Sequence, residues 1–380
     1  MMQKIVYLID SLHKPHDSVL PLLCQKINWL AENSSYEIYV VSVEKSKKTP
    51  CCQFSSKVHV TNLAINYDEL HKFSFFKRII MRAKKRVAHR KLLEKALVEI
   101  QPTTIVSIYG MKNRWRKNLG NVGKNILEIH ADRKLLENIL VEKSRSYISM
   151  FSKMYFKFRF WKELKEYDTV VYDTEELKQR CEDKTSHYTT LTISNPMMDY
   201  PEFKEKESQK VMAIGDSYTK SSFEQLISIW ERITFKYPEW RLHLYGNGEQ
   251  QMCKNIIKER HLSKTVQCYP LPINMHEVYP KYSLYIQTNE MDEFGHRVME
   301  AMANGIPCIA YDVPFGLREL IRNEANGFLV IPNHQMDFTC KLGILIRNQA
   351  LRDSMSRQAY EDMRKYELDA IMKLWMDIYE

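Results

Sequence analysis

Hydrophobic and polar positions in the first half of the chain alternate between two kinds of segment. Short apolar runs rich in β-branched residues predict strands at 4–9, 36–43, 58–60, 104–108, 126–129 and 169–172. Longer segments between them carry apolar residues at helical spacing and predict helices at 19–32, 75–100 and 161–167. Strands that are joined through helices form βαβ units, so this half predicts a parallel sheet.

The same alternation restarts after Ser194, Asn195 and Pro196. Further strands are predicted at 210–214, 241–245, 266–268, 284–287 and 307–311, with helices at 223–237 and 250–260. A final helix at 368–379 carries apolar residues at helical spacing and must pack on another element. The polar stretch near 196–206 indicates a junction. We therefore predict an α/β protein with domains 1–196 and 197–364, followed by a C-terminal helix within 365–380.

Composition narrows the function classes. The 380 residues include 56 Lys and Arg against 47 Asp and Glu, a formal charge of +9, which favours anionic partners without choosing among them. The eight cysteines include no C-x-x-C, so neither a zinc site nor a thioredoxin-type site is indicated. The first apolar run is too short for a signal peptide, and no apolar stretch is long enough to span a membrane. We expect a cytoplasmic protein, soluble or peripheral.

Glycine is scarce, and its distribution is informative. The chain has 11 glycines, and none precedes Gly110. A dinucleotide fingerprint or a P-loop needs glycines in the first strand-to-helix turn, so neither is built at the N-terminus. A nucleotide site must therefore be formed later in the chain.

The segment 289–330 carries the strongest chemical signal. A predicted strand ends at Thr288, an acidic turn contains Asp292, and Gly295 precedes a helix that contains Glu300. A glycine lets the backbone approach a ligand closely, and the N–H groups at a helix start attract anions. The two acids could accept hydrogen bonds from two sugar rings of one ligand. Alternatively, the acidic turn only stabilises the helix dipole.

This segment resembles the donor-binding signature of retaining family 4 glycosyltransferases, in which an E-x7-E motif precedes an alanine-rich helix and a G-F-L-V strand. Other parts of the chain are similar to the same family: 128–130 (EIH), 170–177, 194–196 and 237–249. The resemblance implies the GT-B fold, in which two Rossmann-like parallel-sheet domains face a cleft and a C-terminal helix crosses back to the N-domain. It also implies a nucleotide-sugar donor linked to UDP or GDP, no cofactor and no metal.

The resemblance assigns roles to individual residues. Asp292 matches the first acid, which binds the transferred sugar, and Glu300 matches the second, which holds the ribose. His130 matches a histidine beside the transferred sugar, although a histidine there could also be merely satisfied in the wall of the site. The loop whose amides meet the sugar and phosphates corresponds to Phe294, Gly295 and His296. We take His130 and Asp292 as the catalytic candidates.

The chain also departs from the family pattern. The family usually has an Arg after the glycine that ends the first C-domain strand, and here Asp216 follows Gly215. Lys220 stands about one place from the family's Lys. A paired glycine after the first N-domain strand is also missing, in the stretch HKPHDSVLP. Loss of a cation beside a leaving diphosphate is costly, so we expect Lys220, Arg297 or Arg318 to compensate, or activity to be impaired.

A basic segment at 73–95 interleaves Lys and Arg with aromatic and aliphatic residues. Such a helix is typical of a membrane surface, less often of a nucleic-acid face, and it can also be a plain solvated surface. The resemblance favours an anionic membrane, because many such enzymes use lipid-linked acceptors. The candidate membrane or acceptor surface comprises Lys77, Arg78, Arg82, Lys84, Lys85 and Arg86.

The sequence thus predicts a retaining glycosyltransferase that moves a sugar to a lipid-linked or saccharide acceptor, in cell-surface polysaccharide synthesis at the inner face of the membrane. One alternative is a non-catalytic GT-B subunit that binds a glycan or a partner enzyme. Another is a nucleic-acid-binding protein that uses the 73–95 helix, although no nucleic acid is expected as a partner.

Overall fold

The structure is a computed structural model that describes residues 3–12, 19–44, 53–111, 123–130, 147–181, 187–197, 200–215, 220–246, 250–272, 274–288, 295–314 and 316–380. The chain divides into two compact units. Unit 1 is Met1–Met198 together with Ile371–Glu380, and unit 2 is Asp199–Ala370.

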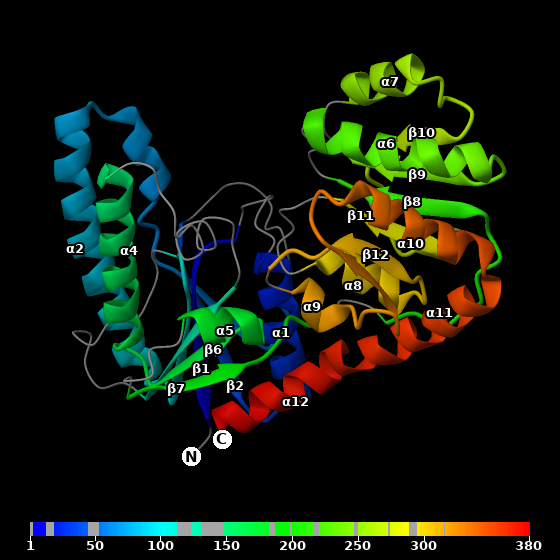
Figure 1. Ribbon diagram of the computed structural model, residues 1–380. Helices are drawn as coiled ribbons and strands as arrows, with labels where there is room; N and C mark the ends of the chain where they lie inside the picture. Colours follow the sequence, from blue (N-terminus) through cyan, green and yellow to red (C-terminus); the bar gives the residue numbers. More distant parts are fainter. Residues whose placement is uncertain are drawn as a thin grey trace. The chain divides into compact units, whose positions relative to one another are not determined.

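Unit 1 is built on a seven-stranded sheet with the order β3-β2-β1-β4-β5-β6-β7 (Figure 1). All neighbouring strands pair in parallel. The strands are β1 (Lys4–Ser11), β2 (Glu37–Glu44), β3 (Val58–Asn62), β4 (Thr104–Ile108), β5 (Lys124–Ile129), β6 (Thr169–Tyr172) and β7 (Thr189–Thr192). The helices are α1 (Val19–Asn33), η1 (Tyr67–Lys72), α2 (Phe75–Ile100), α4 (Tyr147–Leu164), α5 (Glu175–Cys181) and most of α12 (Leu368–Tyr379).

Unit 2 has a six-stranded sheet with the order β10-β9-β8-β11-β12-β13, again parallel throughout. Its strands are β8 (Lys210–Ile214), β9 (Arg241–Tyr245), β10 (Val266–Tyr269), β11 (Leu284–Gln287), β12 (Cys308–Tyr311) and β13 (Gly327–Val330). Its helices are α6 (Lys220–Lys236), α7 (Gln250–Glu259), η3 (Tyr279–Lys281), α8 (His296–Ala303), α9 (Leu317–Leu320), α10 (Gln335–Arg347), α11 (Gln349–Met363) and η4 (Arg364–Tyr366).

The central strands of both sheets are buried, apart from the first residues of β1 and β8. Ile5, Val6 and Tyr7 of β1 are fully buried, as are Leu284 and Tyr285 of β11. Parallel sheets covered by helices on both faces need continuous apolar strands, which explains why the apolar runs do not alternate with polar residues. The predicted α/β class with two parallel-sheet domains is confirmed.

Each sheet has a point at which the strand order reverses direction. In unit 1 this point lies between β1 and β4, and in unit 2 it lies between β8 and β11. Ligands of open α/β sheets bind beyond the carboxyl ends of the strands at such a switch point. The carboxyl ends of β8 and β11 are therefore where a ligand of unit 2 is expected.

The helix predicted at 161–167 was wrong at both ends. Helix α4 spans Tyr147–Leu164, so it begins earlier, and residues 165–167 form a turn in which the Tyr167 amide donates to the Leu164 carbonyl. Aromatic and basic residues are closely interleaved from 153 to 162, and that mixture hides the helical period.

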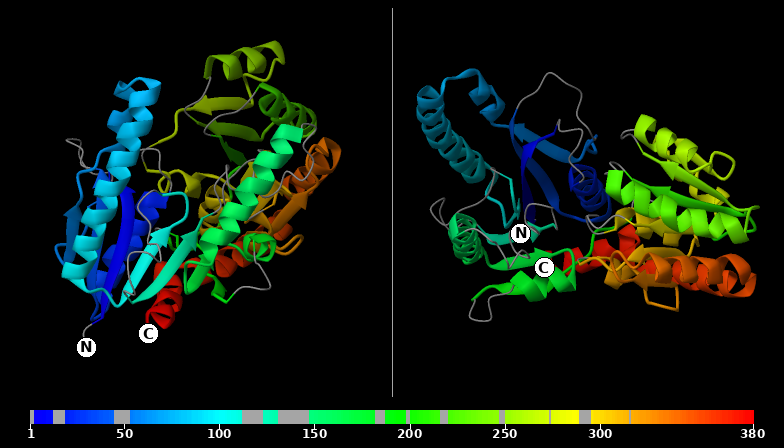
Figure 2. Two further views of the ribbon diagram at one scale, coloured as in Figure 1. Left: turned by 90° about the vertical axis from the view of Figure 1, so that its left-hand side faces the viewer. Right: turned by 45° about the horizontal axis from the view of Figure 1, so that its top comes forward.

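Helix α12 packs on unit 1. The Tyr379 hydroxyl lies 2.6 Å from the Tyr7 hydroxyl of β1, and Lys124 of β5 donates to the carbonyl of Ile378. Trp375 and Tyr379 stack on each other and are both buried. Figure 2 shows the end of α12, in red, beside the strands of unit 1. The last ten residues therefore complete the core of a unit whose other residues precede position 199.

Candidate functional site

The candidate residues fall into separate groups in the two units. In unit 2, Gly215 follows β8, Gly246 follows β9, and Gly295 precedes α8, which comes after β11. In unit 1, His130 follows β5 directly. All four positions lie at carboxyl ends of strands or in the connections that follow them, where α/β proteins bind ligands.

Gly295 is required by the geometry at the start of α8. Its φ is 76°, and it is the N-cap residue of the helix. A Cβ added there would lie 2.5 Å from Leu317 Cδ2 and 3.3 Å from Leu320 Cδ1, both on α9. The left-handed backbone disfavours a side chain, and Leu317 would have to shift to admit one. Helix α9 is thereby packed directly against the start of α8, next to the predicted sugar and phosphate loop.

Glu300 is held in a defined orientation, although its side chain is 31% exposed. The Tyr279 hydroxyl donates a 2.6 Å hydrogen bond to Glu300 Oε2, and Arg297 Nη1 lies 3.1 Å from the same oxygen. Burial, and then the nearby Glu300 charge, raise the pKa of the Tyr279 hydroxyl well above its usual value. Tyr279 therefore remains a donor, and Oε1 has no partner within the described part of the chain. This carboxylate is fixed through one oxygen and can accept ligand hydroxyls at the other.

The turns after β8 and β9 are packed backbone to backbone. Gly215 N donates to the Tyr245 carbonyl at 2.9 Å, and a Cβ at Gly246 would lie 2.1 Å from the Gly215 carbonyl oxygen. Gly246 therefore cannot carry a side chain without moving the Gly215 turn. The two glycines bring these turns together at the carboxyl ends of adjacent strands.

The three cations considered as substitutes for the family's Arg have different surroundings. Lys220 is 72% exposed at the start of α6 and lies 3.9 Å from Glu224, a loose surface pair. Arg297 is bound to Glu300. Arg318 forms a two-point contact with Asp312, at 2.6 and 3.1 Å. Of the three cations, Lys220 would give up the weakest ion pair in order to bind an anion.

Two polar residues at the end of β11 were missed by the sequence analysis. Gln287 and Thr288 are each 3% exposed. The amide oxygen and nitrogen of Gln287 and the hydroxyl of Thr288 have no hydrogen-bond partner among the described residues. Buried polar atoms are rarely left unpaired. Their place at the β8/β11 switch point makes them candidates for contact with a ligand. The available signal was a pair of polar residues that ends an otherwise apolar strand.

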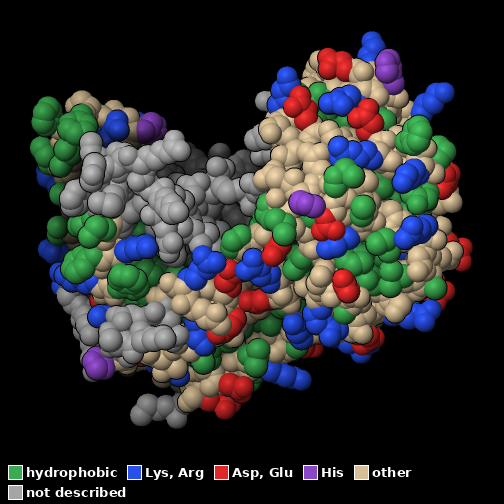
Figure 3. All heavy atoms as spheres, in the orientation of Figure 1, with side chains coloured by type: hydrophobic (Ala, Val, Ile, Leu, Met, Phe, Trp, Pro, Cys, Tyr) green, Lys and Arg blue, Asp and Glu red, His purple; other side chains and the backbone are tan. Residues whose placement is uncertain are grey.

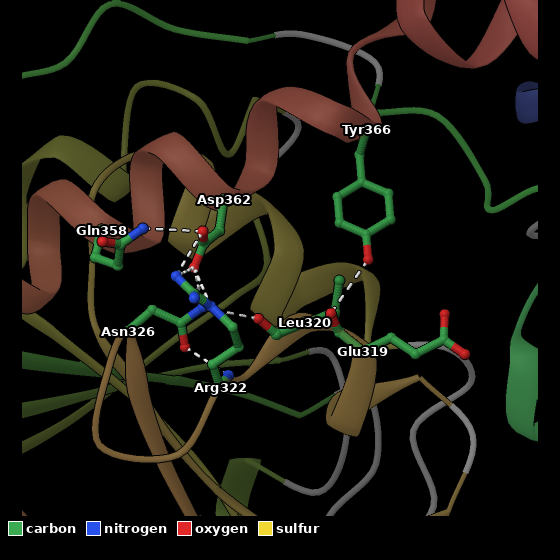
Figure 4. Close-up of polar contacts among 7 residues, drawn as sticks. All are labelled: Glu319, Leu320, Arg322, Asn326, Gln358, Asp362 and Tyr366. Atoms are coloured by element: carbon green, nitrogen blue, oxygen red, sulfur yellow. Dashed lines mark hydrogen bonds and ion pairs between the residues drawn. The ribbon is translucent and has the colours of Figure 1, made fainter.

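A polar network fixes the segment that carries α9 (Figure 4). Arg322, two residues after α9, makes a two-point contact with Asp362 of α11, with distances of 3.0 and 2.8 Å. Asn326, which is fully buried, donates to Asp362 at 2.7 Å and to the Leu320 carbonyl at 3.0 Å. Through α9, this network holds the residues that press on Gly295.

In unit 1, His130 lies beside a buried ion pair. Its Nε2 is 3.3 Å from Glu128 Oε2, and Lys26 Nζ of α1 donates a 2.7 Å hydrogen bond to the same oxygen. Lys26 and Glu128 are each 2% exposed, and His130 is 11% exposed. The predicted catalytic histidine is therefore in contact with buried charges that the sequence analysis did not identify.

Several sequence predictions lie outside the described residues. These are the sites Asp292 and Phe294, the departure at Asp216, and positions 13–18 of the first turn. His296 and Arg297 lie in the first turn of α8, as the resemblance implies for residues near the phosphates.

The predicted membrane surface lies on the first half of α2, where buried residues begin only at His89. Phe75, Phe76 and Ile80 are 69%, 79% and 56% exposed. Figure 3 shows hydrophobic side chains gathered at the end of α2 that begins at Phe75. Lys77, Arg78, Arg82, Lys84 and Arg86 are exposed on the same stretch.

Lys85 differs from the other five basic residues of this surface. Its ammonium donates to the carbonyls of Ile65 and Asn66 and to Glu69, at 2.6, 2.7 and 3.0 Å. Lys85 therefore anchors α2 to the preceding segment. Among the described residues, no helix is both long enough and apolar enough to cross a membrane.

Comparison with known proteins adds three findings. Residues 199–362 match the model of the family described as glycosyl transferases group 1. An uncharacterized glycosyltransferase of Haemophilus influenzae is 27% identical over 214 residues, which are 56% of this chain and 61% of that protein. The poly(glycerol-phosphate) alpha-glucosyltransferase of Bacillus subtilis is 26% identical over 239 residues, covering 60% of this chain and 33% of that protein.

Among solved structures, S. aureus TarM in complex with fondaparinux, α-GlcNAc-glycerol and UDP superposes with a TM-score of 0.68. The alignment covers 100% of both chains at 12% identity. This likeness shows the fold, and the predicted GT-B fold with two Rossmann-like parallel-sheet domains is confirmed. The chain covers less than two thirds of the two curated relatives' lengths.

Proposed function

Because residues 199–362 match the model of the glycosyl transferases group 1 family, we propose that this protein is a glycosyltransferase. It transfers a sugar from a nucleotide diphosphate sugar, with retention of anomeric configuration, to a lipid-linked or saccharide acceptor. One relative is named as a poly(glycerol-phosphate) alpha-glucosyltransferase, and we propose that this chain likewise acts in the synthesis of a cell-surface polysaccharide.

The observation that carries the proposal is the arrangement around α8. Glu300 is held through Oε2 by Tyr279 and Arg297, which leaves Oε1 to accept hydroxyl groups. Gly295 allows α9 to pack against the helix start. Ribose recognition by a fixed carboxylate, and phosphate recognition by amides at the helix start, together fit a nucleoside diphosphate.

In the proposed reaction, the bond between the anomeric carbon and the diphosphate oxygen breaks and a bond to the acceptor oxygen forms on the same face. The donor's own phosphate oxygen assists removal of the acceptor proton. His130 and Asp292 contact the transferred sugar, and Lys220 and Arg297 offset the charge of the leaving diphosphate. Positioning, rather than covalent chemistry by the protein, supplies the rate enhancement.

We propose UDP as the donor nucleotide, with GDP as the second choice, because TarM was solved with UDP. No metal or cofactor takes part in the proposed reaction. Transfer measured with an excess of a chelator should match transfer without it. A loss that added Mg²⁺ or Mn²⁺ restores would contradict a metal-independent mechanism.

A thermal-shift screen of UDP, GDP and ADP sugars tests donor binding directly, since a ligand that binds only the native state raises the melting temperature. Glu300→Ala should abolish the shift caused by the preferred donor. Glu231→Ala is the matched control, because Glu231 also pairs with one arginine, Arg260, at 3.0 Å but on the surface of α6. An unchanged shift in Glu300→Ala would contradict the assignment of this site.

We also propose that the first half of α2 binds an anionic membrane surface. The exposed Phe75 and Phe76 would enter the headgroup region, and the exposed basic residues would attract the lipid charge. Each basic residue near an anionic leaflet contributes about 1 kcal/mol. Replacing Lys77, Arg82 and Lys84 with Gln should therefore weaken binding to phosphatidylserine vesicles about a hundredfold.

A non-catalytic GT-B subunit is the second candidate, and the observation that favours it is Asp216 in place of the family's Arg. Donor binding without transfer or hydrolysis would support that candidate. Salt-sensitive binding to oligonucleotides, without binding to anionic vesicles, would instead favour a nucleic-acid surface on α2.

A further inference from the structure

Three residues far apart in the sequence form a buried charged cluster in unit 1. Lys26 comes from α1, Glu128 from β5 and Trp375 from α12. Lys26 Nζ lies 2.7 Å from Glu128 Oε2 and 3.7 Å from the centre of the Trp375 ring. The ammonium therefore has a carboxylate as one neighbour and an aromatic face as another, and both are attractive to a cation.

Stability alone does not explain a buried ion pair. Removing two charges from water is costly, and apolar residues of similar volume are often at least as stable in the same place. Lys26 lies in an otherwise apolar face of α1, between Cys24 and Ile27, where a Leu or Met would be the ordinary choice. We therefore look for the role of the ion pair in its contact with His130.

The charges of the pair are maintained by each other. Burial favours the neutral acid at Glu128, but attraction to Lys26 and the contact with His130 outweigh it and lower the pKa of the carboxyl below its usual value. Burial lowers the pKa of the Lys26 ammonium, and the Glu128 charge opposes that shift. Glu128 therefore presents a negative charge to His130.

The position of His130 relative to the carboxylate is well defined. Nε2 lies 3.3 Å from Glu128 Oε2, and neither ring nitrogen has a hydrogen-bond partner in the described part of the chain. Glu128 Oε1 is also buried, and no described residue is its hydrogen-bond partner. A small rotation of the imidazole would bring an Nε2–H group onto Glu128 and leave Nδ1 for a substrate group.

Helix α12 prevents Lys26 from moving away. Trp375 covers the ammonium, Tyr379 stacks on Trp375, and Tyr379 is itself bound to Tyr7 of β1. Lys124 donates to the Ile378 carbonyl near the end of the same helix. Lys26 is therefore enclosed by elements from three parts of the chain, and its ammonium stays on Glu128.

We propose that Lys26 and Glu128 are positioning residues, covered by Trp375, that orient the His130 imidazole and fix which of its nitrogens carries a proton. This inference rests on the proposed function, in which His130 contacts the transferred sugar. Glu128 acts through His130, and Lys26 acts through Glu128. Through Trp375, helix α12 thereby helps to position His130, the catalytic candidate at the end of β5.

A double-mutant cycle on transfer kinetics tests the route through His130. Glu128→Gln keeps the shape of the side chain and removes its charge, so kcat should fall about 10- to 100-fold while the KM for the donor stays within about twofold. In a His130→Ala background, Glu128→Gln should cause no further fall, because its target is absent. Equal losses in both backgrounds would overturn the proposal.

A second comparison separates positioning from stability. Lys26→Met leaves a buried, uncompensated carboxylate and should lower the melting temperature, whereas Lys26→Met combined with Glu128→Gln should recover most of that loss. The recovered double variant should still have a low kcat. If the neutral pair restores kcat together with stability, the pair is only structural and the proposal fails.

The matched control is the surface pair of Lys4 and Glu37, 3.8 Å apart at the amino-terminal ends of the paired strands β1 and β2. Lys4→Met and Glu37→Gln make the same chemical changes in the same unit. Both should leave kcat within about twofold of the parent.

A spectroscopic readout keeps the inference testable if the proposed function is wrong. Imidazole ¹⁵N spectra of the full chain, with His130 identified through His130→Ala, should show that Glu128→Gln changes the Nδ1 and Nε2 shifts of His130. The resonances of exposed His261 in unit 2 should not change. Altered His130 shifts without any transfer by the parent protein would sink the proposed function but leave the positioning role intact. Unaltered shifts would overturn the positioning role.

Discussion

Glu300 in unit 2 and Glu128 in unit 1 are both carboxylates that accept contacts on a single oxygen, yet their surroundings differ. Glu300 is 31% exposed and is bound by a tyrosine and an arginine of its own neighbourhood. Glu128 is 2% exposed and is bound by a lysine 102 residues away in the sequence. An exposed, oriented carboxylate can exchange water for a ligand at low cost, whereas a buried one can act only on its protein neighbours.

The largest effect that this contrast predicts is that of Lys26→Met on folding. Breaking a buried ion pair by removing one partner typically costs about 3–5 kcal/mol. The free energy of unfolding from urea titration should fall by that amount. A change below about 1 kcal/mol would mean that Glu128 is less isolated from water than its 2% exposure indicates.

Asp362→Ala should have the next largest effect. Asp362 accepts hydrogen bonds from Arg322, Asn326 and Gln358, and Asn326 is fully buried (Figure 4). Losing charge-assisted bonds of this kind costs about 1–3 kcal/mol. Because the network supports α9, we also expect weaker donor binding in calorimetry. Glu361→Ala, which removes only a surface pair with Arg364, is the control for both measurements.

Gly295→Ala should cost about 1–2 kcal/mol, because a left-handed backbone is unfavourable for alanine. The added Cβ would also lie 2.5 Å from Leu317, which would have to move. Donor affinity should fall more than stability does, since the displaced elements border the predicted phosphate loop. A variant that loses stability but binds the donor normally would separate Gly295 from the site.

Arg297→Met should change stability by no more than about 1 kcal/mol, since exposed ion pairs contribute little. Donor affinity should nevertheless decrease, because Glu300 loses a contact that orients it and the diphosphate loses a cation. Calorimetry with the nucleoside diphosphate measures the affinity, and Arg260→Met, which breaks the pair with Glu231, is the matched control.

The smallest predicted effect is a pH dependence of stability that comes from Glu128. It is seen only in acid. The folded-state pKa of its carboxyl is lowered below the ordinary value of 4.5, because Lys26 and His130 outweigh the opposing effect of burial. Its contribution to stability is therefore fully present above pH 4.5 and is lost as the pH falls through the folded-state pKa. Between pH 5 and pH 3, the urea midpoint of the parent should fall more steeply than that of Glu128→Gln.

The sequence predicted the architecture well where the signal was local. Continuous apolar runs identified the buried strands, and the spacing of glycines pointed to the turns of unit 2, because both depend on residues that are close in sequence. The prediction of a helix at 161–167 had the wrong bounds, because aromatic and basic residues are interleaved from 153 to 162 and hide the helical period. Gln287 and Thr288 were not identified, because their lack of partners among the described residues is visible only in three dimensions.

The buried cluster could not have been predicted from the sequence. Lys26 is an ordinary polar interruption in an amphipathic helix, and nothing local connects it with Glu128 or with Trp375, which lies more than 300 residues later in the sequence. His130 itself was found only through the resemblance, because a single histidine after a strand has no distinctive spacing. Long-range pairing of charges is set by topology, here by β5 and α12 meeting α1.

The division of unit 1 between the two ends of the sequence has a consequence for synthesis. Residues 371–380 leave the ribosome only after all of unit 2 has been made, and domains generally fold as they emerge. Until then, Lys26 lacks the cover of Trp375, and Tyr7 lacks its bond to Tyr379. The core of unit 1 therefore remains incomplete during synthesis. His130 reaches its final environment only after both units have been translated.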